Sequence, residues 1–448
     1  MIGVVVSRAD SASEHVGEHL LAEADWTERT DDSWTDAEGG GTVYRTDDVE
    51  LRFFDAWHLE LKNVTGVFDG PSLVVFASRH SGETGPLLTA HFTGNFGAAE
   101  FGGADRTLAR ACPNAQKRAL AVLAEHAPPG YEVSAECTHH GPTAVDAPSL
   151  FVELGSEAEQ WTDPAGARAV ARAILALGDV APDREKQLAW FGGNHYAPRP
   201  TRLVRETDWA VGHVAADWCL DDLGRPEAHA DVVDQAFERS AATHAVVAAG
   251  DPALERVIAD LGYRAVSETW VRQTDGVALP LVAALEDALC PVEEGLRFGE
   301  PARFQTSGDG FDVATLPSDL LAEATGIDRE AVAAAAAETA LAYETAEGGS
   351  LVAGQAAFVD AAAAGAFLDR LLELLRRKHD EVTLADGTVV ARRTAFDPAL
   401  AADRGVPEGP AFGKLAGGDP VTVDGETVRP ADVSTERVAR FAVGSLTD

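Results

Sequence analysis

The sequence predicts an α/β protein: a three-layer α/β/α domain with a mixed, mostly parallel sheet, followed by a mainly helical C-terminal extension. Three observations lead to this fold class. Apolar runs of strand length alternate with well-delimited helical segments in the first part of the chain. The sequence changes in texture after about residue 285, and residues 327–377 are rich in alanine and leucine. The length of 448 residues exceeds what one hydrophobic core usually organises. We therefore expect a catalytic domain over residues 1–285 and an extension of open role over residues 286–448.

The first part of the chain supplies the strands and helices of this domain. Apolar runs of strand length occupy residues 2–6, 72–77, 87–92, 132–137, 150–154, 188–191 and 245–248. Helix starts are marked by Ser11 with Glu14 as a capping box, by Pro113, by Asp163 with Pro164, and by Pro226. Gly178 ends the third of these helices. This alternation is typical of a sheet covered by helices.

The extension carries a different pattern. Residues 327–377 are rich in alanine and leucine, and an apolar stripe at helical spacing runs from Phe367 to Leu375. From residue 382 onward, Asp-Gly pairs at 386–387 and 424–425 separate short apolar runs. Such pairs favour tight turns, so we expect small hairpins near the C-terminus.

Composition indicates a folded protein adapted to concentrated salt. The net charge is -37, and only five of the 36 basic residues are lysine. In multimolar salt the Debye length is roughly 3 Å or less, so this self-repulsion is screened. The chain is therefore expected to come from a halophile. Salt also weakens charge-driven RNA binding, so any bound RNA must be held mainly by stacking and hydrogen bonds.

Other classes of protein are disfavoured by what the sequence lacks. No apolar run is long enough to span a membrane, and the N-terminus has no secretion signal, so we expect a cytoplasmic protein without membrane contact. The four cysteines form no CxxC pair, which predicts reduced thiols. A GxSxG elbow, a Walker A loop and a GxGxxG fingerprint are all missing.

Polar or glycine-rich loops follow five of the predicted strands, and four of these loops carry histidine or glutamate, while the fifth follows the strand that carries His91. They occupy residues 78–85, 94–97, 136–142, 153–156 and 191–199. The carboxyl ends of strands in open α/β sheets are where ligands bind, so these loops are expected to meet at one rim. Structural roles compete at single positions: His91 is equally well a core histidine, Ser156 an N-cap, and Gly192-Gly193 a turn. His139 and His140 point to opposite faces of an extended chain.

A separate pattern, His15-Val16-Gly17-Glu18-His19, has the residue order of inverted zinc proteases. Two imidazoles four residues apart on one helix face can bind a metal. The pattern lies at the start of a surface-type helix with a glycine inside it, where solvated histidines are common, and we favour that interpretation.

Five motifs together resemble the archaeal and plant D-aminoacyl-tRNA deacylases in order and spacing. They are Ser78-Arg79-His80-Ser81, Gly94-Asn95-Phe96-Gly97, Thr138-His139-His140-Gly141-Pro142, Glu153-Leu154-Gly155-Ser156 and Gly192-Gly193-Asn194-His195-Tyr196-Ala197-Pro198-Arg199. The resemblance covers approximately residues 1–280 and is specific only as a set. It implies a fold related to peptidyl-tRNA hydrolases and nucleoside phosphorylases, and zinc-dependent hydrolysis of the ester between a D-amino acid and tRNA. Glu83 departs from the lysine or small polar residue expected in the first loop.

The resemblance also implies roles for individual residues. Catalytic duty falls to His80, His140, His195 and Glu136, of which Glu136 would orient an imidazole. Metal ligation falls to His80, His91, His139, His140, Glu153 and His195. Substrate binding falls to Arg79, Ser81, Gly94, Asn95, Thr138, Ser156, Tyr196 and Arg199, with oxyanion contacts at residues 94–95 or 192–193. Zn²⁺ is the expected cofactor, the aminoacylated 3′ end of tRNA the expected partner, and a monomer the expected state.

Two rival functions remain open from the residues alone. A nucleoside phosphorylase-like or peptidase-like enzyme fits the same sheet, but no phosphate or peptide site is evident in the sequence. A non-catalytic protein that binds tRNA ends needs aromatic or arginine stacking but no clustered imidazoles.

Overall fold

The computed structural model describes residues 1–248 and 250–446, and it divides into two compact units, Met1–Asp275 and Gly276–Asp448. The division lies somewhat before residue 285, where the sequence changes texture. None of the helices in the described residues is long and apolar enough to cross a membrane.

The larger sheet of the N-terminal unit is mixed and mostly parallel, which confirms the predicted fold class. Its strands lie in the order β2 (Thr27–Asp31), β3 (Gly41–Arg45), β4 (Val49–Phe54), β1 (Ile2–Ser7), β5 (Val74–Arg79), β10 (Ser149–Gly155), β6 (Leu87–His91) and β9 (Glu132–Ala135). Strands β4, β1, β5 and β10 pair in parallel. Strand β6 runs antiparallel to β10, and β9 runs parallel to β6. Strands β2, β3 and β4 pair antiparallel at the other edge, and the reversal between β10 and β6 decides where the polar loops meet.

A second, fully parallel sheet follows in the same unit. Its order is β12 (Ala210–Ala215), β11 (Gln187–Phe191), β13 (His244–Val247) and β14 (Arg264–Val266). The small strands β7 (Gly94–Asn95) and β8 (Thr107–Leu108) pair separately. The backbone N–H groups of Cys137 and Thr138 donate to the carbonyl oxygens of His195 and Val214, so the chain after β9 is tied to the second sheet.

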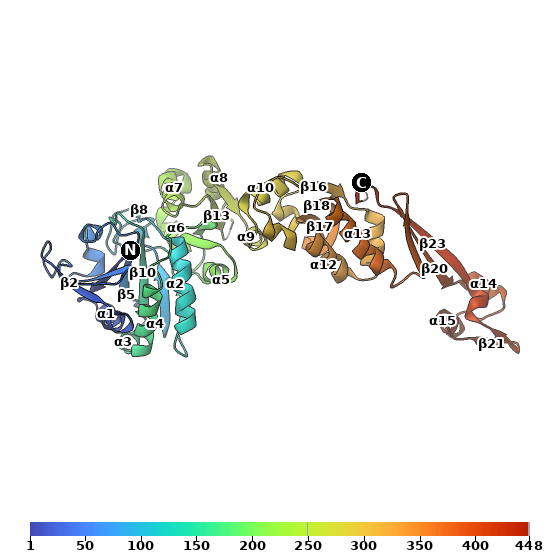
Figure 1. The fold of residues 1–448 in the computed structure, drawn as a ribbon, viewed down its shortest axis with the longest axis horizontal. Helices are drawn as coiled ribbons and strands as arrows, with labels where there is room; N and C mark the ends of the chain where they lie inside the picture. Colours follow the sequence, from blue (N-terminus) through green and yellow to red (C-terminus); the bar gives the residue numbers. More distant parts are fainter. Residues whose placement is uncertain (249, 447–448) are drawn as a thin grey trace. The chain divides into compact units, whose positions relative to one another are not determined.

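Helices cover the sheets and are punctuated largely as predicted. They are α1 (Ser11–Glu23), α2 (Pro113–His126), α3 (Ala158–Trp161), α4 (Pro164–Leu175), α5 (Pro198–Glu206), α6 (Asp217–Leu223), α7 (Ala230–Glu238), α8 (Pro252–Asp260) and α9 (Glu268–Gln273), with the 3-10 turns η1 (His58–Glu60), η2 (Val64–Val67) and η3 (Pro226–Ala228). Helix α4 packs against both α1 and α2, and these helices lie beside the larger sheet in Figure 1.

The helix starts test the capping predictions. Asp163 caps α4 with Pro164 in its first turn, and Pro113 opens α2, as predicted. The cap of α1 is Asp10, whose carboxylate accepts from Ala12 and Ser13, so the predicted Ser11 capping box is wrong by one residue. Pro226 opens only the turn η3.

The core of the N-terminal unit lies on both faces of the central strands, because β1 and β10 are buried along their whole length. Helix α1 closes on one face through Val16 and Leu20, and Gly17 lets it approach the sheet closely. On the other face, Phe76 and Phe151 stack with ring centroids 4.5 Å apart. That second face carries the polar cluster described below.

The C-terminal unit is mixed α/β and not mainly helical, which corrects the expectation for the extension. One sheet has the strand order β15 (Arg297–Phe298), β17 (Ala342–Ala346), β18 (Leu351–Phe358) and β16 (Asp312–Thr315). A second sheet has the order β19 (Glu381–Ala385), β20 (Thr388–Phe396) and β23 (Ser434–Ala442). Strands β21 (Val421–Val423) and β22 (Glu426–Val428) form a separate hairpin. Its helices are α10 (Leu279–Ala288), α11 (Ser318–Thr325), α12 (Arg329–Thr339), α13 (Ala361–Leu375), α14 (Pro398–Asp403) and α15 (Pro410–Ala416), with turns η4 (Val292–Glu294), η5 (Glu300–Phe304), η6 (Glu347–Gly349), η7 (Pro430–Val433) and η8 (Gly444–Leu446). The stripe from Phe367 to Leu375 is the buried face of α13. Both Asp-Gly pairs form the predicted hairpin turns.

Candidate active site

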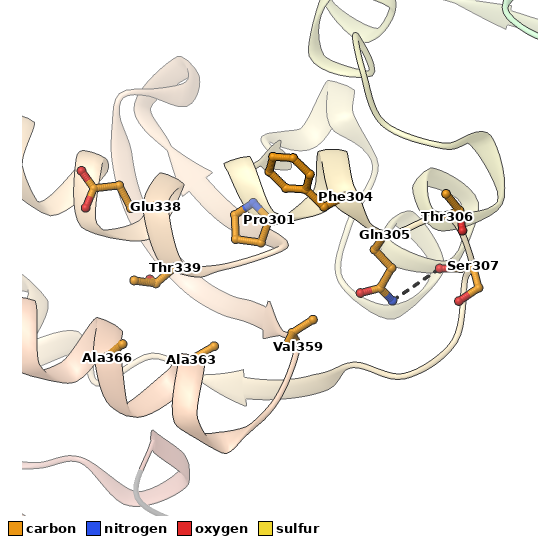
Figure 2. A pocket seen from close by; sticks show the side chains of 10 residues that line it. All are labelled: Pro301, Phe304, Gln305, Thr306, Ser307, Glu338, Thr339, Val359, Ala363 and Ala366. Carbon is orange, nitrogen blue, oxygen red and sulfur yellow. Dashed lines mark hydrogen bonds between the residues drawn. The ribbon is translucent and has the colours of Figure 1, made fainter.

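A cavity of about 630 Å³ in the N-terminal unit contains most of the predicted site residues. Its lining includes Trp57, His58, Leu59, Ser78, Arg79, His80, Ser81, Phe101, His139, His140, Phe151, Glu153, His195 and Tyr196. A second hollow, of about 660 Å³, lies on the C-terminal unit and is lined by Phe304, Glu338, Val359 and small residues (Figure 2). Its one ionisable side chain, Glu338, already pairs with Arg370 at 3.2 Å. The cavity of the N-terminal unit is therefore the candidate for catalysis.

The site lies over a face of the larger sheet and not at the predicted carboxyl rim. Glu153 pairs with Thr89 and Phe151 pairs with His91, because β6 is antiparallel to β10. Side chains two residues apart on a strand share a face, so Phe151, Glu153 and His91 project to the same side. The carboxyl end of β6 points away from the carboxyl end of β10, which is why a single rim does not form.

Five segments bring their side chains to this face. His80 directly follows β5, His91 ends β6, Glu136 directly follows β9, Glu153 lies within β10, and His195 lies in the loop after β11. The turn after β9 adds His139 and His140. The backbone of His140 has a φ of 47°, which is the left-handed conformation. The structure thus brings His80, His140, His195 and Glu153 together as expected, and their individual roles stay predictions.

Glu136 is fully buried and lies between several imidazoles. Its Oε1 is 3.1 Å from His80 Nδ1, and its Oε2 is 2.9 Å from His195 Nε2 and 3.8 Å from His139 Nε2. Burial alone would raise the pKa of Glu136, but the hydrogen bond with His195 and the nearby His80 ring outweigh it and hold the pKa well below its ordinary value. Glu136 therefore carries a negative charge in the folded protein.

Glu153 is the second buried carboxylate. It lies 3.6 Å from His80 Nδ1 and 3.4 Å from His91 Nε2. Burial opposes its ionisation, yet the neighbouring His80 and His91 rings lower its pKa to about 2. Burial likewise opposes charge on His80, but bonds to Glu136 and Glu153 raise the pKa of His80 to about 10. His80 is therefore an imidazolium between two carboxylates at neutral pH.

His139 and His140 have the opposite electrostatic character. Burial, and then the neighbouring His91, lower the pKa of His140 to about 4 and that of His139 well below its ordinary value. Their Nδ1 atoms donate to the carbonyl oxygens of Cys137 and Gly141, at 2.8 Å for His139 and 2.6 Å for His140. Both rings are therefore neutral, and each has its Nε2 lone pair free.

The residues at this face fit a metal ion. One ring nitrogen from each of His91, His139 and His140 lies within 4.8 Å of the others. His91 Nδ1 also donates to a main-chain carbonyl, that of Phe92 at 3.1 Å, and its buried Nε2 lies 3.4 Å from Glu153 Oε1. Imidazoles fixed in this way by outer hydrogen bonds are typical zinc ligands. Two further groups are close enough: Cys137, His139 and His195; and His80, Glu136 and Glu153.

The first of these three groups fits zinc best. The Cys137 thiol is buried beside Cys219, and both effects raise its pKa, which disfavours the thiolate that zinc requires. In the third group, the two carboxylates already bind the His80 imidazolium. All four cysteines are free thiols, as predicted.

The predicted substrate-binding residues separate into two sets. Arg79, Ser81 and Tyr196 line the cavity. The Arg79 guanidinium lies 4.3 Å from the centre of the Trp57 ring and 4.9 Å from that of Trp161, and the Tyr196 hydroxyl is 3.3 Å from His80 Nε2.

The other predicted substrate-binding residues do not line the cavity. Asn95 bonds the loop that follows it, Gly94 packs under Leu108, Thr138 is buried against His213, Ser156 bonds Thr84 and Gly85, and Arg199 bonds Glu268 and the carbonyl of Ala248. In the described residues they hold other parts of the chain in place, and their predicted contact with substrate has no support in this geometry.

The protease-like pattern forms no metal site in the described part of the chain. The rings of His15 and His19 lie 5.0 Å apart, but neither belongs to a group of three possible ligands. His15 Nδ1 bonds the carbonyl of Trp161 at 3.0 Å. The interpretation as ordinary helix residues fits this geometry.

Sequence reasoning missed several residues of the cavity, chiefly Trp57, His58, Phe101 and Phe151. Phe151 is one of several apolar residues in a buried strand, so nothing in the sequence distinguishes it from a core residue. Trp57 and Phe101 lie in loops, where hydrophobic periodicity gives no signal. The position of Phe101 before Gly102-Gly103, in an otherwise polar segment, was the available indication.

Comparison with known proteins extends these observations. The family model described as D-aminoacyl-tRNA deacylase matches residues 67–264. A D-aminoacyl-tRNA deacylase of Natronomonas pharaonis is 53% identical over 98% of this chain and 100% of its own length. One of Halorubrum lacusprofundi is 52% identical over 100% of this chain and 98% of its own. These two matches extend over both units.

Among solved structures, the crystal structure of a conserved protein of unknown function is similar with a TM-score of 0.55 at 27% identity. The match covers 61% of this chain and 98% of that one. That protein is therefore similar to only part of this chain, whereas the two relatives match both units.

Proposed function

This chain belongs to the D-aminoacyl-tRNA deacylase family, and on that premise we propose that the cavity lined by His80, His140 and Glu153 is where the ester is hydrolysed. The chain is a hydrolase that releases D-amino acids from tRNA, as the motif resemblance predicted. The observation that carries the location is the convergence of five imidazoles and two buried carboxylates on one face of the sheet. A non-catalytic protein that binds tRNA ends would need no such cluster.

We propose that His91, His139 and His140 hold a Zn²⁺ ion. A general base needs one nitrogen, whereas three convergent nitrogens with fixed outer hydrogen bonds are what a metal site needs. When bound in such a set, zinc lowers the pKa of a coordinated water to about 7 and polarises a carbonyl. The family resemblance points to the same cofactor.

The other residues supply the proton chemistry of the chain itself. An aminoacyl ester is cleaved when water adds to its carbonyl carbon and the ribose oxygen leaves with a proton. His80 carries a proton at neutral pH and has Nε2 directed to the Tyr196 hydroxyl at the cavity. We assign to His80 the donation of that proton to the ribose oxygen, with Glu136 and Glu153 holding the ring in orientation.

The neighbouring groups define what binds in the cavity. A volume of about 630 Å³ is in the range of small-molecule pockets, so it accepts the aminoacylated terminal nucleotide and not the body of the tRNA. Tyr196 and Arg79 are positioned to contact that nucleotide. We propose that the enzyme proofreads chirality in cytoplasmic translation, and that the L-substituent clashes with a wall that the D-substituent avoids.

The test uses matched D- and L-tyrosyl-tRNA in molar KCl. The wild-type protein should release only the D-amino acid. His140→Ala should abolish turnover and reduce the zinc content measured by elemental analysis, while circular dichroism shows an unchanged fold. The control is His126→Ala, at the C-terminal end of α2 and outside the cavity lining.

Two results would contradict these assignments. Deacylation retained by His140→Ala would remove His140 from the site. Full activity of protein shown to be metal-free would remove zinc from the mechanism, and His140 would then be left as the base that activates water.

A further inference from the structure

Four aromatic side chains line the cavity, and one of them has neither a ring nor a cation as a partner in the described residues. Phe151 stacks on Phe76, Trp57 faces the Arg79 guanidinium, and the Tyr196 hydroxyl bonds His80. Phe101 makes no aromatic or cation contact within the described chain, and it is 68% exposed. A large apolar ring at the mouth of a catalytic cavity is thus left open to solvent.

The backbone that carries this ring is nevertheless fixed. The carbonyl of Phe101 accepts from the N–H of Gly141, next to His140, at 3.0 Å. Asn95 Nδ2 donates to the carbonyls of Gly102 at 3.0 Å and Ala104 at 3.2 Å. Because the loop is tied to the histidine-bearing turn, a ligand that contacts the ring meets a surface already in place. Preorganisation of this kind lowers the entropy cost of binding.

The observations together identify the ligand by its chemistry. We propose that Phe101 is the platform on which the terminal adenine of the tRNA stacks while its ester lies among the histidines. The inference rests on the proposed function, which places the aminoacylated end in this cavity. Adenine is the planar group that every substrate shares, whatever its amino acid.

The salt environment expected from the net charge favours this contact over a charge-based one. At 1 M salt the Debye length is about 3 Å, which screens attraction between surface cations and phosphates. Stacking of a base on an aromatic ring does not depend on net charge. A chain of charge -37 therefore gains more from an exposed aromatic ring than from added basic residues.

The first experiment compares deacylation of D-alanyl-tRNA and D-tyrosyl-tRNA in molar KCl. Phe101→Ala should lower kcat/KM roughly 5- to 100-fold, and by the same factor for both substrates. Phe101→Trp, which keeps an aromatic face, should stay near wild type. The matched control is Phe304→Ala, which removes an exposed phenylalanine, 87% exposed, from the hollow of the C-terminal unit (Figure 2) and should leave kcat/KM unchanged.

The second experiment separates stacking from a merely structural role of the loop. Both enzymes are assayed on D-alanyl-tRNA whose terminal ribose lacks its base. The kcat/KM of wild type should fall on the base-free substrate by the same factor that Phe101→Ala causes on normal tRNA. The kcat/KM of Phe101→Ala should fall little further on the base-free substrate. Such a cycle isolates the contact between ring and base.

Three results would overturn the proposal: undiminished activity of Phe101→Ala, a loss confined to D-tyrosyl-tRNA, or a loss that persists in full on the base-free substrate. The second would assign the ring to the amino-acid side chain, and the third would assign it to loop stability. Failure of wild type to release D-tyrosine at all would instead count against the proposed function.

Discussion

His213 is a buried histidine whose titration should weaken the fold at moderately acidic pH. Its side chain is inaccessible to solvent, Nε2 donates to the carbonyl of Ala109 at 2.8 Å, and Nδ1 accepts from the Thr138 hydroxyl at 2.9 Å. Burial lowers its pKa from 6.5 to about 4, and Arg239 is the charged group that adds to this effect. Thr138 immediately precedes His139, so the neutral His213 ring anchors the turn that carries the active-site imidazoles.

The sign and size of the effect follow from the two pKa values. The unfolded chain binds the proton from about pH 6.5 downward, whereas the folded chain binds it only near pH 4. The contribution of neutral His213 to the unfolding free energy is therefore fully present above pH 6.5, and it is lost as the pH falls from 6.5 to about 4. One pKa unit corresponds to about 1.4 kcal/mol, so His213 should cost about 2 kcal/mol of unfolding free energy between pH 7.5 and pH 5.

The assay is denaturant unfolding in molar KCl at both pH values for wild type and His213→Gln. The variant should be less stable at pH 7.5, because a buried hydrogen bond is lost, by roughly 1–3 kcal/mol. Its further loss between pH 7.5 and pH 5 should be smaller than that of wild type by about 2 kcal/mol. His126→Gln is the control for a histidine of the same unit away from this contact. An unchanged pH dependence in His213→Gln would refute the reasoning.

Further changes test the site and the units. Glu136→Gln keeps the side-chain volume but removes the charge opposite His80 and His195, so single-turnover deacylation should slow on the order of 10²- to 10⁴-fold with near-ultraviolet circular dichroism unchanged. Gly155→Ala would place a Cβ 2.6 Å from that of His80, so kcat should fall more than substrate affinity, and wild-type turnover would contradict this packing. A fragment of residues 1–275 should unfold cooperatively and still release D-tyrosine; aggregation would show that the second unit is needed for folding.

Much of the site was predictable because strands and their following loops have strong local patterns. His80, Glu136 and Glu153 follow or lie in apolar runs that become β5, β9 and β10. Strand direction was not predictable, since it depends on pairing between distant segments. The antiparallel β6 therefore moved the site from the expected rim to a face of the sheet.

Other differences have equally local causes. Asp10 competes with Ser11 as a helix cap, and a one-residue choice between good capping residues depends on tertiary contacts, here the bond from the N–H of Arg79 to Asp10. The alanine and leucine content of residues 327–377 suggested a mainly helical segment, and α12 and α13 form within it, yet Leu351–Phe358 forms β18, packed against both helices. Burial of small residues in a sheet overrides their helix propensity.

The single carboxylate of Glu136 binds both His80 and His195, and this has a consequence for how the enzyme tolerates change. Once Glu136 is replaced, replacing His80 or His195 as well has less further effect on activity. The loss of activity in a double variant should therefore be well below the product of the two single losses. A substitution at Glu136, His80 or His195 is then tolerated only to the extent that the other two residues allow it, so these three positions are expected to change together.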